Sequence, residues 1–267
     1  MKVTHQIWLG EEIPNIFLEY RQMWLDRFPN YKHIFHRNND LRDLIQDYYN
    51  EYLELYDSFE LNIERIDFFR CAMLHHYGGI YIDLDVLPLR EFENLLELNC
   101  VVLGFEPEEH MKHWNHKHQI IGNAFMISPP KDPFWLNLMK YIKKNYLKGR
   151  GPVHNTGPIC LSNFFIEHPE KFKNVRIEPA NSFYPITNKD GEKTEIFEGV
   201  KYNYISKNCQ MSKAYVVHLW SGSWGKEVSG KNNITSSSVF WLFIYIFLAL
   251  MIFISISVVI VQHDKKN

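Results

Sequence analysis

One helix–turn–strand segment constrains the fold of this chain more than any other: Ile66–Arg90, IDFFRCAMLHHYGGIYIDLDVLPLR. It reads as a helix that ends at a Gly78–Gly79 turn, where glycine can adopt a positive φ, and continues into a short apolar strand. Asp67 and Arg70 lie three residues apart and therefore share one helix face. Charged groups on an otherwise apolar face need partners, because burying an unpaired charge is costly. The pattern predicts a polar site against this helix.

The strand that follows ends in two aspartates. Side chains of a strand alternate between its faces, so Tyr81, Asp83 and Asp85 share one face and the apolar residues between them share the other. Two carboxylates on one side repel each other unless a cation neutralises them, and oxygen ligands suit Mg²⁺ or Mn²⁺. The sequence therefore predicts a divalent-cation site at Asp83 and Asp85. The plainer interpretation of such a pair is a solvated turn.

Composition narrows the class of protein. A chain of 267 residues can form one large domain, and its net charge of −2 gives no electrostatic reason to expect a nucleic-acid partner. The four cysteines have no metal-binding CxxC spacing and read as buried thiols, although a disulfide remains open.

Alternating strand and helix patterns predict an α/β layered domain over residues 1–225. Asn62 is the predicted cap of the helix that carries Asp67. The predicted strands are Val3–Trp8, Tyr31–His36, Asn99–Phe105, Asn123–Ser128 and Tyr215–Trp220, in addition to the one that ends at Asp85. The other predicted helices are Asn15–Phe28, Asp40–Phe59, Pro133–Tyr146 and Gly157–Glu167.

The C-terminal part has a different composition. Residues 239–261 are uncharged and long enough to cross a hydrocarbon core of about 30 Å, so they predict a single transmembrane anchor. A polar linker, 226–238, precedes it and a short tail, 262–267, follows. The sequence predicts a single-pass protein of the endomembrane system. The missing N-terminal signal favours a cytosolic main domain, whereas the sequon at Asn233 would matter only on the lumenal side.

Several ordered motifs resemble the DXD-containing sugar transferases of glycosyltransferase family 32, which includes inositol-phosphoceramide mannosyltransferases. The resemblance covers about Val3 to Trp224. Its motifs are His5-Gln6-Ile7-Trp8-Leu9-Gly10, Asp67-x-x-Arg70, Tyr77-Gly78-Gly79-Ile80-Tyr81-Ile82-Asp83-Leu84-Asp85, Asn123-Ala124-Phe125-Met126, Thr156-Gly157-Pro158, His218-Leu219-Trp220 and Ser223-Trp224.

The resemblance implies a GT-A fold, a Rossmann-like domain that binds a nucleotide sugar, and a retaining transfer of mannose, galactose or glucose from a GDP- or UDP-sugar. It implies Mn²⁺ or Mg²⁺ bound by Asp83, Asp85 and His218, which would neutralise the leaving diphosphate. The acceptor would be a glycan or a glycolipid. Without the resemblance, His218 would read as a hydrogen-bonded core histidine.

The remaining roles also follow from the resemblance. Asp67 and Arg70 would hold the donor sugar and ribose, with a structural ion pair as the plainer interpretation. Trp8 would stack on the nucleobase, where ordinary core packing is the alternative. The donor-binding set is completed by Tyr81, Asn123, Ser223 and Trp224, the last two closing over the diphosphate.

Two other functions stay open at this point. A strand ending in Asp83-Leu84-Asp85-Val86 also fits the nucleophile motif of Mg²⁺-dependent haloacid-dehalogenase-type phosphatases. That chemistry requires further acidic residues downstream, and the later aspartates of this chain are scattered. A catalytically idle membrane protein that binds nucleotide sugars is the non-enzymatic alternative.

Overall fold

The structure, a computed structural model, describes residues 2–187 and 213–223. The chain divides into two compact units, Met1–Ser221 and Gly222–Asn267. Within the described ranges no helix is long and apolar enough to span a membrane. The predicted linker at 226–238, the anchor at 239–261 and the tail lie outside the described residues.

A six-stranded mixed sheet forms the centre of the first unit, in the order β2-β1-β3-β6-β5-β7. β1 runs parallel to β2 and β3, β6 runs antiparallel to β3 and β5, and β7 is parallel to β5. Because β3 and β5 are both antiparallel to β6, their C-terminal ends lie at the same edge of the sheet. The strands are β1 (Val3–Ile7), β2 (Lys32–His36), β3 (Gly79–Ile82), β5 (Val101–Phe105), β6 (Ile121–Ser128) and β7 (Val175–Glu178).

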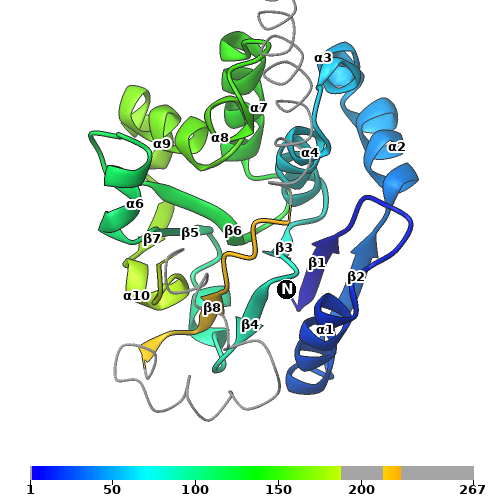
Figure 1. Cartoon of the computed structure of the whole chain (residues 1–267), viewed down its shortest axis with the longest axis vertical. Coiled ribbons are helices and arrows are strands. Elements are labelled where there is room, and N and C mark those ends of the chain that lie inside the picture. Colours follow the sequence, from blue (N-terminus) through cyan, green and yellow to red (C-terminus); the bar gives the residue numbers. More distant parts are fainter. Residues whose placement is uncertain (1, 188–212, 224–267) are drawn as a thin grey trace, which may run out of the picture. The chain divides into compact units, whose positions relative to one another are not determined.

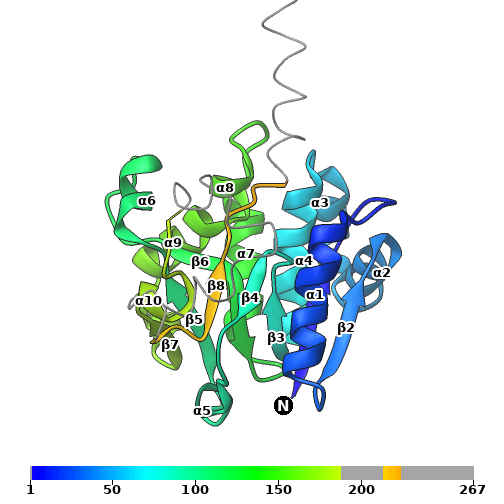
Figure 2. The same ribbon diagram turned by 60° about the horizontal axis from the view of Figure 1, so that its bottom comes forward.

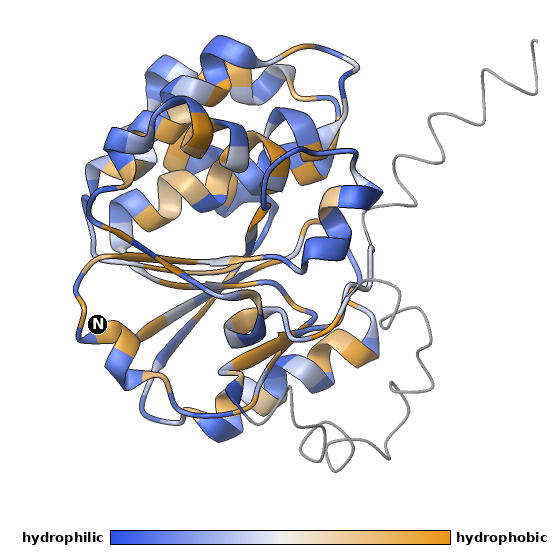
Figure 3. Ribbon diagram, turned by 90° about the vertical axis from the view of Figure 1, so that its left-hand side faces the viewer, coloured by the Kyte–Doolittle hydropathy of each residue, from blue (hydrophilic) through white to orange (hydrophobic). Residues whose placement is uncertain are grey.

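Helices cover one face of this sheet, and helices with a small second sheet cover the other (Figures 1 and 3). The first face packs against α2 (Asn38–Tyr48), α3 (Leu53–Ser58), α4 (Asn62–Tyr77), α7 (Pro133–Asn145) and α9 (Pro158–Glu167). The second face packs against α1 (Asn15–Arg27), α10 (Ala180–Phe183) and the antiparallel pair β4 (Val86–Pro88) and β8 (Val216–His218). The short elements are η1 (Asn50–Tyr52), α5 (Glu93–Leu96), α6 (Glu108–His113), α8 (Pro152–Asn155) and η2 (Pro169–Phe172).

The predicted α/β layered domain is therefore confirmed, with some differences in its elements. The predicted helix over 40–59 is divided into α2, η1 and α3. The cap expected at Asn62 is wrong: Asn62 is already helical, and the carboxylate of Glu64 accepts from the main-chain N–H groups of Glu60 and Leu61. β4, β7, α5, α6 and α10 were not predicted, because segments of three to six residues carry little periodicity.

The glycine turn between α4 and β3 forms as predicted. Gly78 and Gly79 have φ of +64° and +96°. A Cβ on Gly79 would lie 2.7 Å from the carbonyl oxygen of Val3, so β1 passes directly against this turn. Alternation along β3 is confirmed as well: Tyr81 packs into the core on the α4 side, and Ile80 and Ile82 pack on the other.

Two buried histidines hold the same turn. His5 Nε2 lies 3.1 Å from the Gly78 carbonyl oxygen, and His5 Nδ1 lies 3.0 Å from His36 Nε2. Because a carbonyl can only accept, Nε2 of His5 carries the proton and Nδ1 accepts from His36. Burial lowers the pKa of His5 to about 3 and that of His36 to about 4. Both rings are thus held neutral in the folded chain.

We predict acid sensitivity from this histidine pair. The folded pKa values lie below the unfolded value of 6.5, so the unfolded chain binds more protons as the pH falls below 6.5. Each histidine should then remove about 1.4 kcal/mol of unfolding free energy per pH unit, down to about pH 4 for His36 and about pH 3 for His5. Denaturant titrations at several pH values should show a shallower slope for His5→Asn than for the unsubstituted chain. Equal slopes would contradict this account.

Candidate active site

The two aspartates lie in the turn that leads from β3 to β4. The Asp83 N–H donates to the Ala124 carbonyl of β6, and the Val86 N–H donates to the Asp83 carbonyl. Val86 is paired with His218 across the β4–β8 ladder, which brings the imidazole beside Asp85. One ligand atom from each of Asp83, Asp85 and His218 lies within 4.8 Å of the others. The structure thus brings together the predicted metal-binding triad.

Asp85 is the most strongly held member of the triad. Its Oδ1 lies 3.2 Å from His218 Nε2, and its Oδ2 accepts from both the N–H and the hydroxyl of Ser221, each at 2.8 Å. Burial acts to raise the pKa of Asp85, but His218 and the two Ser221 hydrogen bonds outweigh it and lower the pKa to about 2. Burial likewise acts to lower the pKa of His218, and the Asp85 carboxylate raises it. Asp85 is therefore an anion at any physiological pH.

Asp83 faces the helix side of the sheet. It accepts a short hydrogen bond from the Tyr81 hydroxyl, and its Oδ1 lies 3.6 Å from Arg70 Nη1. Its side chain is 24% exposed, compared with 10% for Asp85. Burial raises the pKa of Asp83, Arg70 lowers it, and the neighbouring Asp85 raises it. A cation between the two aspartates would relieve this repulsion.

Arg70 and Asp67 form a buried ion pair behind the triad. Arg70 Nη2 lies 3.0 Å from Asp67 Oδ1, Arg70 Nη1 donates to the Asn123 carbonyl at 2.7 Å, and the guanidinium lies 4.5 Å from the Tyr81 ring centroid. Asp67 also accepts from the Asn123 amide at 3.0 Å and the Thr156 hydroxyl at 2.8 Å. Burial raises the pKa of Asp67 to about 6, against the lowering effect of Arg70. The pair joins α4, β3, β6 and the residue after α8.

The donor set of the triad fits a divalent cation. Carboxylates are typical ligands of Mg²⁺ and Mn²⁺, whereas an imidazole ligand is typical of transition-metal sites, so this set fits Mn²⁺ better than Mg²⁺. Nδ1 of His218 is buried and finds no hydrogen-bond partner among the described residues. The ring is thus held by Asp85 through Nε2 alone, rather than fixed from both sides as in a structural core histidine.

Trp220 packs against the histidine of the triad. The Trp220 ring centroid lies 4.1 Å from that of His218 and 4.4 Å from that of His110, and the indole N–H donates to the Ile186 carbonyl. His110 is itself held by the buried carboxylate of Glu106 at 2.8 Å, just past the end of β5. These ring contacts of Trp220 therefore connect the end of β8 with α6.

Not every predicted site residue joins this cluster. Trp8 is partly buried, packs against Phe17 at 5.4 Å and donates its indole N–H to the Glu12 carbonyl. Its predicted stacking on a nucleobase stays a prediction. Ser223 is exposed and belongs to the second compact unit, and Trp224 lies outside the described residues.

Three residues that contribute to the site were given no role by the sequence analysis. Thr156 belongs to a quoted motif, but no pattern indicated that its hydroxyl binds Asp67. Ser221 begins a Ser/Gly-rich stretch whose composition resembles a linker, so nothing in the sequence marked it as a partner of Asp85. Trp220 was seen only as part of a motif.

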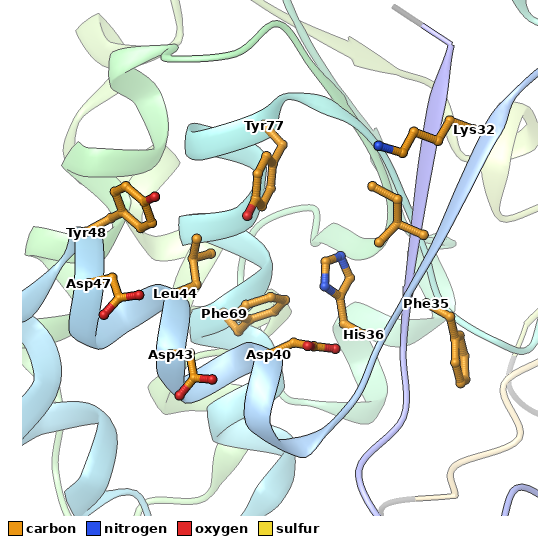
Figure 4. Close-up of a pocket in the computed structure, with 11 residues that line it drawn as sticks. Lys32, Phe35, His36, Asp40, Asp43, Leu44, Asp47, Tyr48, Phe69 and Tyr77 are labelled. Carbon is orange, nitrogen blue, oxygen red and sulfur yellow. The ribbon is translucent and has the colours of Figure 1, made fainter.

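A surface cavity of about 630 Å³ lies elsewhere, between β2 and α2 (Figure 4). Three of the aspartates that line it, Asp40, Asp43 and Asp47, belong to α2. Phe69 and Tyr77 belong to α4. None of the predicted site residues lines this cavity. The cavity is therefore distinct from the triad.

Comparison with known proteins shows which families part of this chain resembles. Residues 14–102 match a family described as a glycosyltransferase sugar-binding region containing a DXD motif. The mannosyl phosphorylinositol ceramide synthase of Saccharomyces cerevisiae is 32% identical over 60% of this chain and 40% of its own length. Inositol phosphoceramide mannosyltransferase 3 of Schizosaccharomyces pombe is 30% identical over 60% of this chain and 43% of its own.

These matches confirm the predicted resemblance: residues 14–102 are similar to the sugar-binding region of DXD-containing glycosyltransferases, and the chain is similar to inositol-phosphoceramide mannosyltransferases. The chain spans about two fifths of the length of these curated relatives. Among solved structures, the PaToxG glycosyltransferase is a distant likeness, with a TM-score of 0.49 and 14% identity over 63% of this chain and 70% of that one.

We predict that Asp67→Ala destabilises the chain strongly. It leaves the Arg70 guanidinium, which is 2% exposed, without its nearer carboxylate partner, and such a loss costs about 3–5 kcal/mol. Thr156→Val, which removes only one hydrogen bond to Asp67, should cost about 1–2 kcal/mol. Denaturant unfolding measures both. Asp57→Ala is the matched control, because it removes a surface pair with Arg42 and should cost less than about 1 kcal/mol. A cost for Asp67→Ala no larger than this control would contradict the buried pair.

Proposed function

We propose that this chain is a membrane-anchored, metal-dependent, retaining hexosyltransferase of GT-A architecture. It moves a hexose from a nucleotide sugar to a glycan or glycolipid acceptor. The single observation that carries the proposal is the convergence of Asp83, Asp85 and His218 at one end of β3, within a chain whose residues 14–102 match a sugar-transferase family. The anchor is the apolar segment 239–261.

The triad would hold Mn²⁺ or Mg²⁺ together with the diphosphate of the donor. A bound divalent cation supplies neutralisation of the charge that develops on the departing nucleoside diphosphate. Asp85, anionic and fixed by Ser221, provides the permanent negative charge of the site. Asp83 is the more exposed of the two carboxylates and is the one that would lie nearer the incoming diphosphate.

Asp67 and Arg70 contact the residues of the metal site and do not themselves bind the metal. Both oxygens of Asp67 are already bonded within the chain, and Arg70 is bonded to Asp67, Asn123 and Asp83. Of the three guanidinium nitrogens of Arg70, only Nε is buried without a hydrogen-bond partner among the described residues. Their burial favours a positioning role for the pair: it orients Asp83 and Asn123 toward the donor.

Mannose is the proposed hexose, supplied as GDP-mannose, with UDP-galactose and UDP-glucose as the other donors to test. Support comes from the two yeast relatives, whose names specify mannosyl transfer and an inositol phosphoceramide. The proposed acceptor is accordingly a glycolipid. A catalytic domain tethered by an apolar segment would act close to such a substrate.

The test uses the full chain in detergent micelles with Mn²⁺ and a panel of GDP- and UDP-sugars, each with a membrane glycolipid extract as acceptor. Release of nucleoside diphosphate from one donor should occur. Asp85→Asn should reduce it at least about 100-fold, the loss expected when a charge-stabilising group is removed from a transfer site. Asp57→Asn, a surface carboxylate, should leave release unchanged.

Donor turnover that survives Asp85→Asn would contradict the metal assignment. Hydrolysis of a phosphomonoester in place of sugar transfer would favour the phosphatase alternative. Tight binding of a nucleoside diphosphate without turnover of any donor would favour the idle binding protein.

A further inference from the structure

The surface cavity between β2 and α2 has no part in the proposed sugar transfer. It has a volume of about 630 Å³, and β2 is the edge strand of the six-stranded sheet. Figure 2 shows β2 and α2 at one edge of this sheet, whereas β4 and β8, beside which the triad lies, are nearer its middle. A ligand of this cavity would therefore be bound apart from the donor sugar.

Three carboxylates of the cavity follow one face of α2. Asp40, Asp43 and Asp47 are spaced by three and four residues, which spreads them over about 10 Å along one side of the helix. Asp40 uses one oxygen to cap its own helix. No hydrogen bond or salt bridge to the carboxylates of Asp43 and Asp47 is found within the described residues, and the neighbouring Arg42 binds Asp57 instead. The carboxylates are thus open to a positively charged ligand.

A buried histidine faces the same cavity from β2. His36 is 6% exposed, and its Nε2 donates to Nδ1 of His5. Because burial lowers the pKa of His36 to about 4, the ring is neutral and its Nδ1 keeps a lone pair. Nδ1 makes no hydrogen bond within the described part of the chain, and it is not one of the fully covered polar atoms there. In Figure 4 the ring extends from β2 toward α2 and α4, so this acceptor is reached from the cavity.

Aromatic rings complete the lining. Phe69 and Tyr77, from α4, and Tyr48, from α2, border the cavity (Figure 4). Tyr48 and Tyr77 are both exposed, so a ligand could cover them. The face of an aromatic ring attracts cations, because its π electrons give it a partial negative charge. Carboxylates, lone pair and rings therefore all favour a ligand that is positive and donates hydrogen bonds.

The same lining restricts the kind of cation. Lys32, at the start of β2, is the cationic side chain among the residues that line the cavity, and it offsets only one of the three carboxylates. The lone pair of His36 needs an N–H donor, which a quaternary ammonium lacks. A single ammonium group cannot contact carboxylates that are spread over about 10 Å of helix. A chain with several ammonium groups meets both requirements.

We propose that this cavity binds a linear polyamine. One ammonium group donates to Nδ1 of His36 and to Asp40. Another binds Asp43 and Asp47 and lies over the ring of Tyr48. The methylene groups between them pack against the apolar and aromatic side chains of the lining.

The histidine pair connects this ligand to the turn before β3. His36 donates to His5, and His5 donates to the Gly78 carbonyl. An ammonium group on Nδ1 of His36 keeps the ring in the tautomer that donates from Nε2. The bound polyamine therefore supports the hydrogen bonds that hold the Gly78 turn.

The test is a calorimetric titration of the full chain in uncharged detergent with spermidine, with choline and butylamine as matched ligands. Spermidine should bind most tightly, because choline has no N–H donor and butylamine has a single ammonium group. Asp43→Asn/Asp47→Asn should weaken spermidine binding at least about fivefold, since two exposed ion pairs are lost. Tyr48→Leu, which keeps an apolar side chain and removes the ring, should weaken it about threefold.

The matched control is Glu51→Gln/Glu54→Gln. It removes two exposed carboxylates, of η1 and α3, that do not line the cavity, and it should leave spermidine affinity unchanged. Equal losses in this control and in Asp43→Asn/Asp47→Asn would indicate a diffuse effect of charge and overturn the proposal. No loss in the latter variant, or choline binding as tightly as spermidine, would overturn it as well.

Two further measurements locate the ligand. In chain labelled with ¹⁵N-histidine, the Nδ1 resonance of His36 should move upfield as spermidine donates to it, and an unchanged resonance would contradict the site. Asp85→Asn should bind spermidine as tightly as the unsubstituted chain, whether or not the chain transfers sugar. Loss of binding in Asp85→Asn would place spermidine at the triad instead.

Discussion

The buried guanidinium of Arg70 is the interaction on which the rest of the site depends. One side chain reaches Asp67 on its own helix, the main chain of Asn123 on β6, the ring of Tyr81 on β3 and the carboxylate of Asp83. A charge buried to this degree is tolerated only when its partners are in place. The position of Asp83 is therefore fixed by the packing of α4 on the sheet, before any ligand binds.

A second set of contacts completes the site from a distant part of the chain. Asp85 meets His218 and Ser221, the latter 136 residues away in sequence, and the β4–β8 ladder provides this approach. The Leu219 N–H also donates to the Asp85 carbonyl. The Asp83–Asp85–His218 cluster therefore depends on the pairing of the last described strand with the segment that directly follows the two aspartates.

The sequence predicted the local part of this arrangement and not the long-range part. The Gly78–Gly79 turn and the shared face of Tyr81 and Asp83 follow from φ preference and strand period, which are local properties. His218 was placed by resemblance alone, since an isolated histidine on a strand indicates no partner. The contact between Thr156 and Asp67 spans 89 residues and has no local signature.

Short elements escaped prediction for a related reason. β4 has three residues, too few for a period to be read, yet its pairing with β8, which lies within the predicted strand Tyr215–Trp220, brings the triad together. The cap predicted at Asn62 was wrong although asparagine is a good capping residue. Glu64, from the first turn of α4, accepts from the free main-chain N–H groups instead. The first failure reflects a long-range strand pairing with no local signature, and the second reflects competition between two residues of the same helix turn.

The central claim is that Asp83, Asp85 and His218 form one divalent-cation site shared with a nucleoside diphosphate. The most direct measurement is a titration of the full chain with Mn²⁺, with and without GDP or UDP. The electron paramagnetic resonance signal of free Mn²⁺ reports how much of the ion is bound. One bound Mn²⁺ per chain is expected, bound more tightly when the diphosphate is present. His218→Ala and Asp83→Asn should each weaken it. Mn²⁺ binding that is unaffected by both substitutions, or that ignores both diphosphates, would contradict the account.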